Sequence, residues 1–263
     1  MARWSSMVEA LTLSVRNWRL WILQFIGNAA IFALFLGWLR VPDAHWWQLL
    51  FQFLLMIVVA AAALVLHGGT LNYLQSAHLD KPKTPPLPPA FLRALKHLLA
   101  IAVCVLVFYF LRNLVDRLDN YELSFPGYLR SGFPAWLRRM ISEPALDNLY
   151  SGFVSLLRFV ILPGLLLPFA LFSADSGFRG LMALRDWSRT VRSIAYWIAL
   201  LAAAVIGVYL GQLIMGWKLD PNTSTLRGEE ASFVTRQLLA YLLGLFSWLL
   251  ACSMLGRTRA TGN

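Results

Sequence analysis

Residues 46–66 read WWQLLFQFLLMIVVAAAALVL, an apolar run without a formal charge. An α-helix rises about 1.5 Å per residue, so about 20 apolar residues cross the roughly 30 Å hydrocarbon core of a membrane. We therefore expect this stretch to be a membrane-spanning helix. Further runs of similar length and composition lie on both sides of it.

Five more stretches meet the same requirement, and two of them are less regular than the others. Residues 98–111 are short for a span, but residues 90–97 can extend the same helix toward water. Residues 153–173 are interrupted by Arg158 and by two prolines. The predicted spans are residues 20–39, 46–66, 98–111, 153–173, 194–215 and 237–255.

The composition of the whole chain supports a membrane location. Hydrophobic residues make up 59% of the 263 residues and charged residues 14%, against roughly 45–50% and 25% in soluble domains. So much apolar surface cannot be hidden in one soluble core, which excludes a water-soluble enzyme. The sequence predicts the all-α fold class, a polytopic bundle of six transmembrane helices in one integral membrane domain (residues 1–263) with an outer loop at residues 112–152.

The distribution of charge predicts the orientation. With the N-terminus inside, the inner segments carry 13 of the 23 Lys and Arg residues and the outer segments nine, and nine of the 13 acidic residues lie outside. The positive-inside rule then places both termini in the cytoplasm and the protein in the cell inner membrane. The formal net charge is +10, and the charged residues lie between apolar runs. We therefore expect the partner to be anionic lipid headgroups at the inner face and not nucleic acid.

Two inner segments have the period of a surface helix. In residues 4–18, Leu11, Val15 and Trp18 recur at steps of four and three, and residues 177–194 repeat this pattern. Both favour amphipathic helices at the membrane surface. Residues 134–141 suit a short helix of the same kind on the outer side.

An Ala-Leu pair precedes the first, third and fifth spans, at residues 10–11, 94–95 and 183–184. This recurrence suggests three tandem units, each an amphipathic lead followed by a two-helix hairpin. Because Ala-Leu is a common pair, chance recurrence is the alternative.

The fourth span and the residues after it carry a recognisable pattern. Residues 162–171 read LPGLLLPFAL, and Gly177, the Ala-Leu pair at 183–184, Ser188 and Trp197 follow. This resembles a pattern in uncharacterised bacterial six-helix membrane proteins, including the membrane domain fused to some glycerophosphodiester phosphodiesterases. There a proline-bearing span ends in a Gly-containing turn and an Ala-Leu-x-x-Ser lead, whereas Ser188 comes one residue late.

The resemblance covers about residues 160–200 of this sequence. It implies a membrane accessory domain. It carries over no catalytic residue, because these 263 residues contain no phosphodiesterase domain.

Sequence signatures of catalysis are absent. The chain has no Gly-x-Ser-x-Gly and no Gly-Lys-Thr/Ser loop, and its histidines lack the spacing of three or four that helical zinc ligands need. We therefore expect a protein that is not an enzyme, with no catalytic residue, metal or cofactor. All acidic residues lie outside the predicted spans, which disfavours ion-coupled transport. The four histidines are His45, His67, His78 and His97.

Arg158 is the one charged side chain well within a predicted span. It lies close enough to the outer boundary for its long side chain to reach the headgroups or a structural partner. The alternative is contact with an anion or a lipid headgroup, because charges inside membranes are often functional.

Two prolines interrupt the same span. Pro163 and Pro168 lack the backbone N–H groups that would bond to the carbonyls of Phe159 and Gly164. Neighbouring helices can satisfy those carbonyls, in which case the prolines serve packing. The alternative is a hinge or an opened binding site.

Polar and small residues mark faces of three further spans. Gln24 and Asn28 are four residues apart, as are Gln48 and Gln52, so each pair shares a helix face. These side chains can form interhelical hydrogen bonds or line a polar path. A face of small residues on the fifth span predicts close helix packing within the bundle or between copies; it consists of Ala199, Ala203, Gly207 and Gly211.

Two functions follow from these features. The first is an accessory, assembly or lipid-contacting inner-membrane protein, with membrane lipid, a membrane protein or a second copy as partner. The alternative is a small permease or channel-like transporter in which Arg158, the kinked fourth span, Gln24, Asn28 and Gln52 line a path.

Overall fold

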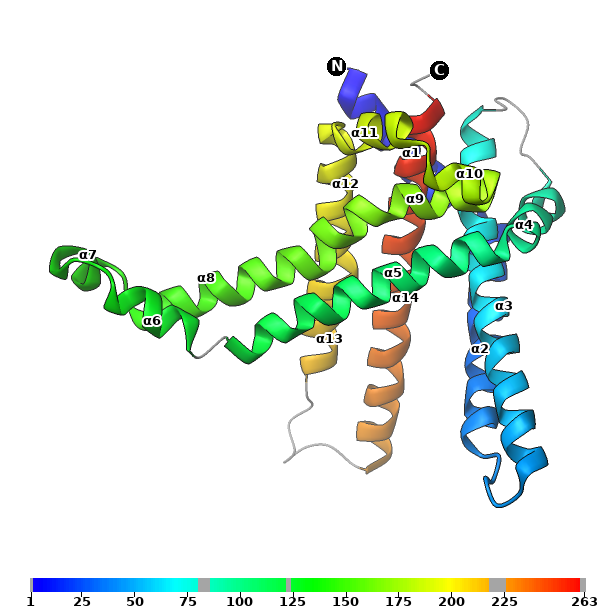
Figure 1. Cartoon of the computed structure of the whole chain (residues 1–263), viewed down its shortest axis with the longest axis horizontal. Helices are drawn as coiled ribbons and strands as arrows, with labels where there is room; N and C mark the ends of the chain where they lie inside the picture. Colours follow the sequence, from blue (N-terminus) through cyan, green and yellow to red (C-terminus); the bar gives the residue numbers. More distant parts are fainter. Residues whose placement is uncertain (1, 80–85, 122–123, 218–225, 261–263) are drawn as a thin grey trace.

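The computed structural model describes residues 2–79, 86–121, 124–217 and 226–260, and all regular structure in these ranges is helical. Six helices are long and apolar enough to cross a membrane, which confirms the predicted all-α fold with six spans (Figure 1). They are α2 (Trp18–Leu39), α3 (Trp46–Leu79), α5 (Leu98–Asp116), α8–η2–α9 (Glu143–Ser176), α12–η3–α13 (Ile194–Gly216) and α14 (Leu226–Ala260). Within the two composite spans, α9 is Leu162–Ser176, α12 is Ile194–Ala204 and α13 is Gly211–Gly216.

Several helices continue beyond the predicted spans. Helix α3 has 34 residues, or about 51 Å at 1.5 Å per residue, which exceeds the roughly 30 Å hydrocarbon core. The apolar run ends at Leu66, but the helix continues to Leu79 because residues 67–79 contain no proline and pack against neighbouring helices. Residues 67–79 of α3 therefore lie in a different environment from the rest of the helix.

Residues 112–152, predicted as an outer loop, are largely helical where the structure describes them. They contain the last turn of α5, the 3-10 helix η1 (Arg117–Tyr121), α6 (Phe125–Ser131), α7 (Ala135–Met140) and most of α8 (Glu143–Leu156). Helix α8 starts at Glu143 with a proline in its first turn, two features that favour a helix N-terminus. The short helix expected at residues 134–141 is α7.

The helix expected to run continuously from residue 90 into the third span is broken. Helix α4 (Leu87–Lys96) ends before His97, whose φ of −106° and ψ of 21° interrupt the helix, and α5 starts at Leu98. The ring of His97 packs against Gly177, where an added Cβ would lie 2.7 Å from His97 Nδ1. The break thus occurs at a tertiary contact.

The inner segment expected as one helix at residues 177–194 forms two. Helix α10 (Phe178–Leu181) and α11 (Leu184–Val191) are separated at residues 182–183. Gly180 lies so close to α9 that an added Cβ would be 2.1 Å from the carbonyl oxygen of Phe172. This close approach holds α10 against the end of α9 and turns the chain before α11 begins.

The helices form three hairpins, and each follows at least one short helix, as the tandem-unit hypothesis expects. Helix α1 (Ala2–Arg16) precedes α2–α3, α4 precedes α5 and α8–α9, and α10 and α11 precede α12–α14. In Figure 1 the first and third hairpins run alongside each other, the middle one crosses them obliquely, and both termini lie at the same end. The internal repeat itself stays a prediction.

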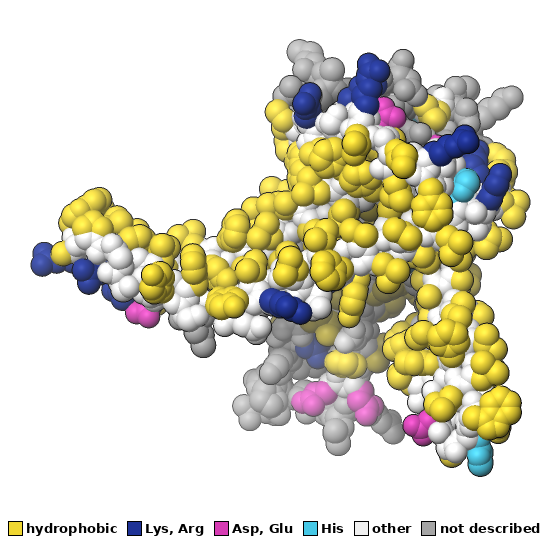
Figure 2. All heavy atoms as spheres, in the orientation of Figure 1, with side chains coloured by type: hydrophobic (Ala, Val, Ile, Leu, Met, Phe, Trp, Pro, Cys, Tyr) yellow, Lys and Arg dark blue, Asp and Glu magenta, His cyan; other side chains and the backbone are white. Residues whose placement is uncertain are grey.

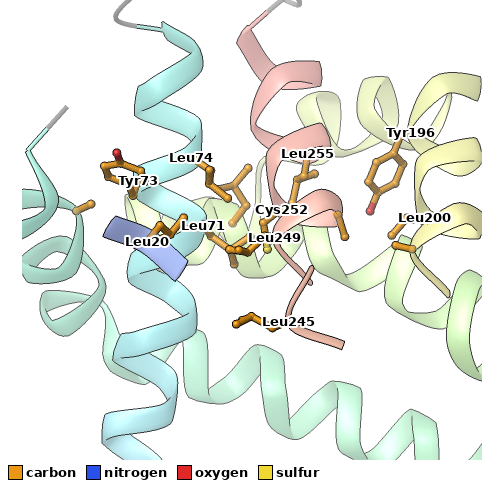
Figure 3. Close-up of a cluster of buried hydrophobic side chains, with 14 of the residues drawn as sticks. Leu20, Leu71, Tyr73, Leu74, Tyr196, Leu200, Leu245, Leu249, Cys252 and Leu255 are labelled. Atoms are coloured by element: carbon orange, nitrogen blue, oxygen red, sulfur yellow. The ribbon is translucent and has the colours of Figure 1, made fainter. Parts of the chain in front are cut away.

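The core lies in the half of the molecule that carries the termini. Figure 3 shows Leu71 and Leu74 of α3 directed toward Leu249 and Leu255 of α14, and all four are at most 3% exposed. Toward the other end, α2 and α3 leave large apolar side chains exposed. These include Phe32, Phe35, Trp46, Phe51 and Leu54 (Figure 2). Such surface is suited to lipid.

Candidate functional site

Gln24 and Asn28, the polar pair of the first span, form hydrogen bonds where α2 meets α3. Gln24 is fully buried, and its side-chain amide donates to the hydroxyl of Thr70 on α3. Asn28 Nδ2 donates to Gln24 Oε1 at 3.0 Å and to the Gln24 carbonyl at 2.8 Å. This network joins α2 to α3.

The polar pair of the second span lies at the far end of the same hairpin. Gln52 Nε2 donates to the carbonyl of Val41 at 2.6 Å, and Gln48 Oε1 accepts from the backbone N–H of His45 at 2.9 Å. Both glutamines therefore fix the turn between α2 and α3.

Arg158 forms an ion pair within the middle hairpin. Its Nε lies 2.7 Å from Asp116 Oδ1, and Arg112 Nε lies 3.7 Å from Asp116 Oδ2. Both guanidinium groups lie 5.9 Å from the centre of the Phe159 ring. Helix α5 extends beyond the predicted third span to Asp116. This acid, which was predicted to lie in a loop, is therefore next to Arg158, the charged residue of the fourth span.

The two prolines affect the fourth span differently. Before Pro163 the helix widens into the π-helical segment η2 (Leu157–Ile161), and the N–H of Leu162 bonds to the Leu157 carbonyl. Pro168 lies inside α9, and the Gly164 carbonyl that it leaves free accepts from the Tyr196 hydroxyl of α12 at 2.9 Å. A neighbouring helix thus supplies the missing donor.

The small residues of the fifth span lie along α14. Ala199 and Ala203 are 2% and 6% exposed. Gly207 faces Ser247, whose Oγ would lie 2.7 Å from an added Cβ. Gly211 is buried, although a Cβ there would have open space around it. The first three residues bring α12 and η3 (Val205–Leu210) close to α14.

Several buried polar side chains near the termini were not singled out from the sequence. Asn72 Nδ2 donates to the carbonyl of Ala174 at 2.9 Å, and Ser253 Oγ donates to the carbonyl of Ala10 at 3.1 Å. Glu9 of α1 pairs with Arg257 of α14. Lone Asn and Ser residues carry no periodic signal, so only the tertiary structure reveals that they join α1, α3, α9 and α14.

The short helices α1, α4, α10 and α11, with the turns that join them to the spans, form what we call the terminal face. Figure 2 shows Lys and Arg side chains gathered there beside hydrophobic ones. Its acids are paired: Asp175 Oδ1 lies 3.3 Å from Arg93 Nη1, Asp186 Oδ1 lies 3.8 Å from Arg189 Nη1, and Glu9 pairs with Arg257. The terminal face therefore carries excess positive charge.

Five exposed cations of the terminal face have no ion pair among the described residues: Arg16, Lys96, Arg179, Arg185 and Arg192. Large apolar side chains lie exposed among them, such as Leu92, Leu95, Leu99, Phe178, Met182 and Leu184. Cations beside exposed apolar groups suit the headgroup region of a membrane.

The described ranges contain no cluster of side chains suited to a metal ion. No group of three or more His, Cys, Asp or Glu side chains there could hold a metal ion.

The fold defines the chain as an all-α, multi-pass membrane protein. Comparison with family models, with curated proteins and with solved structures gave no match. The resemblance to bacterial six-helix membrane proteins therefore stays a prediction.

Proposed function

We propose that this chain is a non-enzymatic inner-membrane protein that acts as a lipid-contacting accessory domain, with the terminal face in the cytoplasmic headgroup layer. The observation that carries the proposal is the set of unpaired cations among exposed apolar side chains on short interfacial helices. Each Lys or Arg near an anionic membrane surface contributes about 1 kcal/mol to binding. Five such residues on one face amount to a strong preference for anionic lipid.

The placement of the polar side chains supports this function over transport. A permease path would need Arg158, Gln24, Asn28 and Gln52 to converge. Instead Gln24 and Asn28 bond within the α2–α3 interface, Gln52 bonds at its turn, and Arg158 pairs with Asp116 on another hairpin. Each of these groups interacts with a near neighbour at a separate place in the fold, and they do not line a common path.

Native mass spectrometry of the full chain, purified in a mild detergent, tests the proposal. We expect retained net-anionic phospholipid, and we expect vesicles containing phosphatidylglycerol to stabilise the protein more than pure phosphatidylcholine vesicles do. Protein that retains no lipid and unfolds equally in both vesicles would contradict it. Solute flux through proteoliposomes that disappears in Arg158→Ala would support the permease instead.

A further inference from the structure

A groove of the terminal face lies where two helix breaks meet. The α4–α5 break at His97 and the α9–α10 turn at Gly177 pack on each other, because Gly177 has a φ of +65° and carries no Cβ that would strike the His97 ring. Together they enclose a groove of about 550 Å³, lined by residues of both turns. Three of its lining residues are basic, namely Lys96, His97 and Arg179.

Among the described residues, neither Lys96 nor Arg179 of this groove forms an ion pair. The nearest acid in the sequence, Asp175, is paired with Arg93. Lys96 and Arg179 are exposed. The groove therefore has at least two positive charges available to an anion.

The walls of the groove are apolar and lead into the membrane. Leu95, Leu99 and Phe178 line it with exposed fractions of 55%, 71% and 56%. From Leu99 an exposed apolar stripe continues along α5 at steps of four, three and four, through Val103, Leu106 and Phe110. A soluble anion gains nothing from contact with this apolar surface, whereas an acyl chain is stabilised by burying it.

We propose that this groove binds one net-anionic phospholipid, with its phosphate between Lys96 and Arg179 and its acyl chains along the exposed stripe of α5. This assignment rests on the proposed function and adds a defined site to it. A zwitterionic lipid is disfavoured, because its headgroup cation meets two like charges at the groove. Basic pockets between helices at the cytoplasmic surface are suited to anionic headgroups.

A charge-matched pair of variants tests the site. Lys96→Gln/Arg179→Gln removes two charges from the groove, and Arg185→Gln/Arg192→Gln removes two exposed charges from α11 and the residue that follows it on the same face. The full chain in detergent is titrated with phosphatidylglycerol or phosphatidylcholine, and bound lipid is counted by native mass spectrometry. All four positions are exposed, and thermal unfolding verifies that each variant folds.

We expect the groove variant to bind phosphatidylglycerol about thirtyfold more weakly, since each of the two cations that contact the headgroup contributes about fivefold, whereas the two control cations do not contact the bound lipid. The α11 variant should weaken binding by about threefold or less, and inorganic phosphate should not displace the lipid. Equal losses in both variants, or displacement by phosphate, would overturn the groove assignment and leave the lipid-contacting function intact. No preference of the wild-type chain for phosphatidylglycerol would instead contradict the proposed function itself.

Discussion

The hydrogen bond between Tyr196 and Gly164 should depend on Pro168. Pro168 has no N–H, so the Gly164 carbonyl four residues earlier lacks its helical donor, and the Tyr196 hydroxyl donates to it at 2.9 Å. Tyr196→Phe removes this donor and keeps the ring in its fully buried place. Pro168→Ala restores the backbone donor.

The expected magnitudes follow from that geometry. An unpaired buried acceptor costs about 1–3 kcal/mol, and interhelical hydrogen bonds measured in membranes reach about 1.7 kcal/mol with a mean near 0.6. Tyr196→Phe should therefore lower the free energy of unfolding by about 1 kcal/mol in the native background. In the Pro168→Ala background the same change should cost less than about 0.5 kcal/mol, because the backbone already satisfies Gly164.

Equilibrium unfolding of the four proteins in mixed micelles of mild detergent and dodecyl sulfate measures this cycle. Tyr209→Phe is the control, since Tyr209 lies in the same span and is 59% exposed; it should change stability by less than about 0.5 kcal/mol. An identical cost of Tyr196→Phe with and without Pro168 would refute the reasoning, because the hydroxyl would then not replace the missing N–H.

Three further outcomes are expected. Gly256→Ala should lower the free energy of unfolding by about 1–3 kcal/mol in the same assay, since its Cβ would lie 3.0 Å from the backbone of Gln75. Gly37→Ala, where an added Cβ has open space, should be neutral or slightly stabilising. A larger loss of stability from Gly37→Ala than from Gly256→Ala would argue against the α3–α14 packing. Arg158→Ala and Asp116→Ala should be non-additive by about 0.5–1 kcal/mol in a double-mutant cycle, whereas strict additivity would mean that their ion pair contributes nothing. Reporter fusions at the two termini should both give cytoplasmic signals, and termini on opposite sides would be incompatible with six spans.

The spans could be predicted because hydropathy is a local average. About 20 apolar residues identify a span wherever they occur, and all six were found in this way. Helix ends could not be placed as well, because polar residues continue a helix whenever tertiary contacts cover them. Asp116 is an example. The third span was predicted to end at residue 111, so Asp116 was not recognised as the partner of Arg158.

The features that involve two distant segments were beyond the sequence. Pro168 showed that the Gly164 carbonyl needs a donor, but nothing in the chain identified Tyr196 as that donor. The break at His97 likewise depends on Gly177, which is 80 positions later. The proposed lipid groove exists only because these two turns meet, so a search along the chain could not find it.

Helix α3 has a mechanical consequence for the protein. It is unbroken from Trp46, near the exposed end of the first hairpin, to Leu79 beside the core, so its two halves can only tilt together. A thicker or thinner bilayer changes the preferred inclination of the lipid-exposed half. The same rotation must act on the buried half, where Asn72 holds α9. A tilt of the lipid-exposed half of α3 would therefore also move the part of the helix that packs at the junction of the three hairpins.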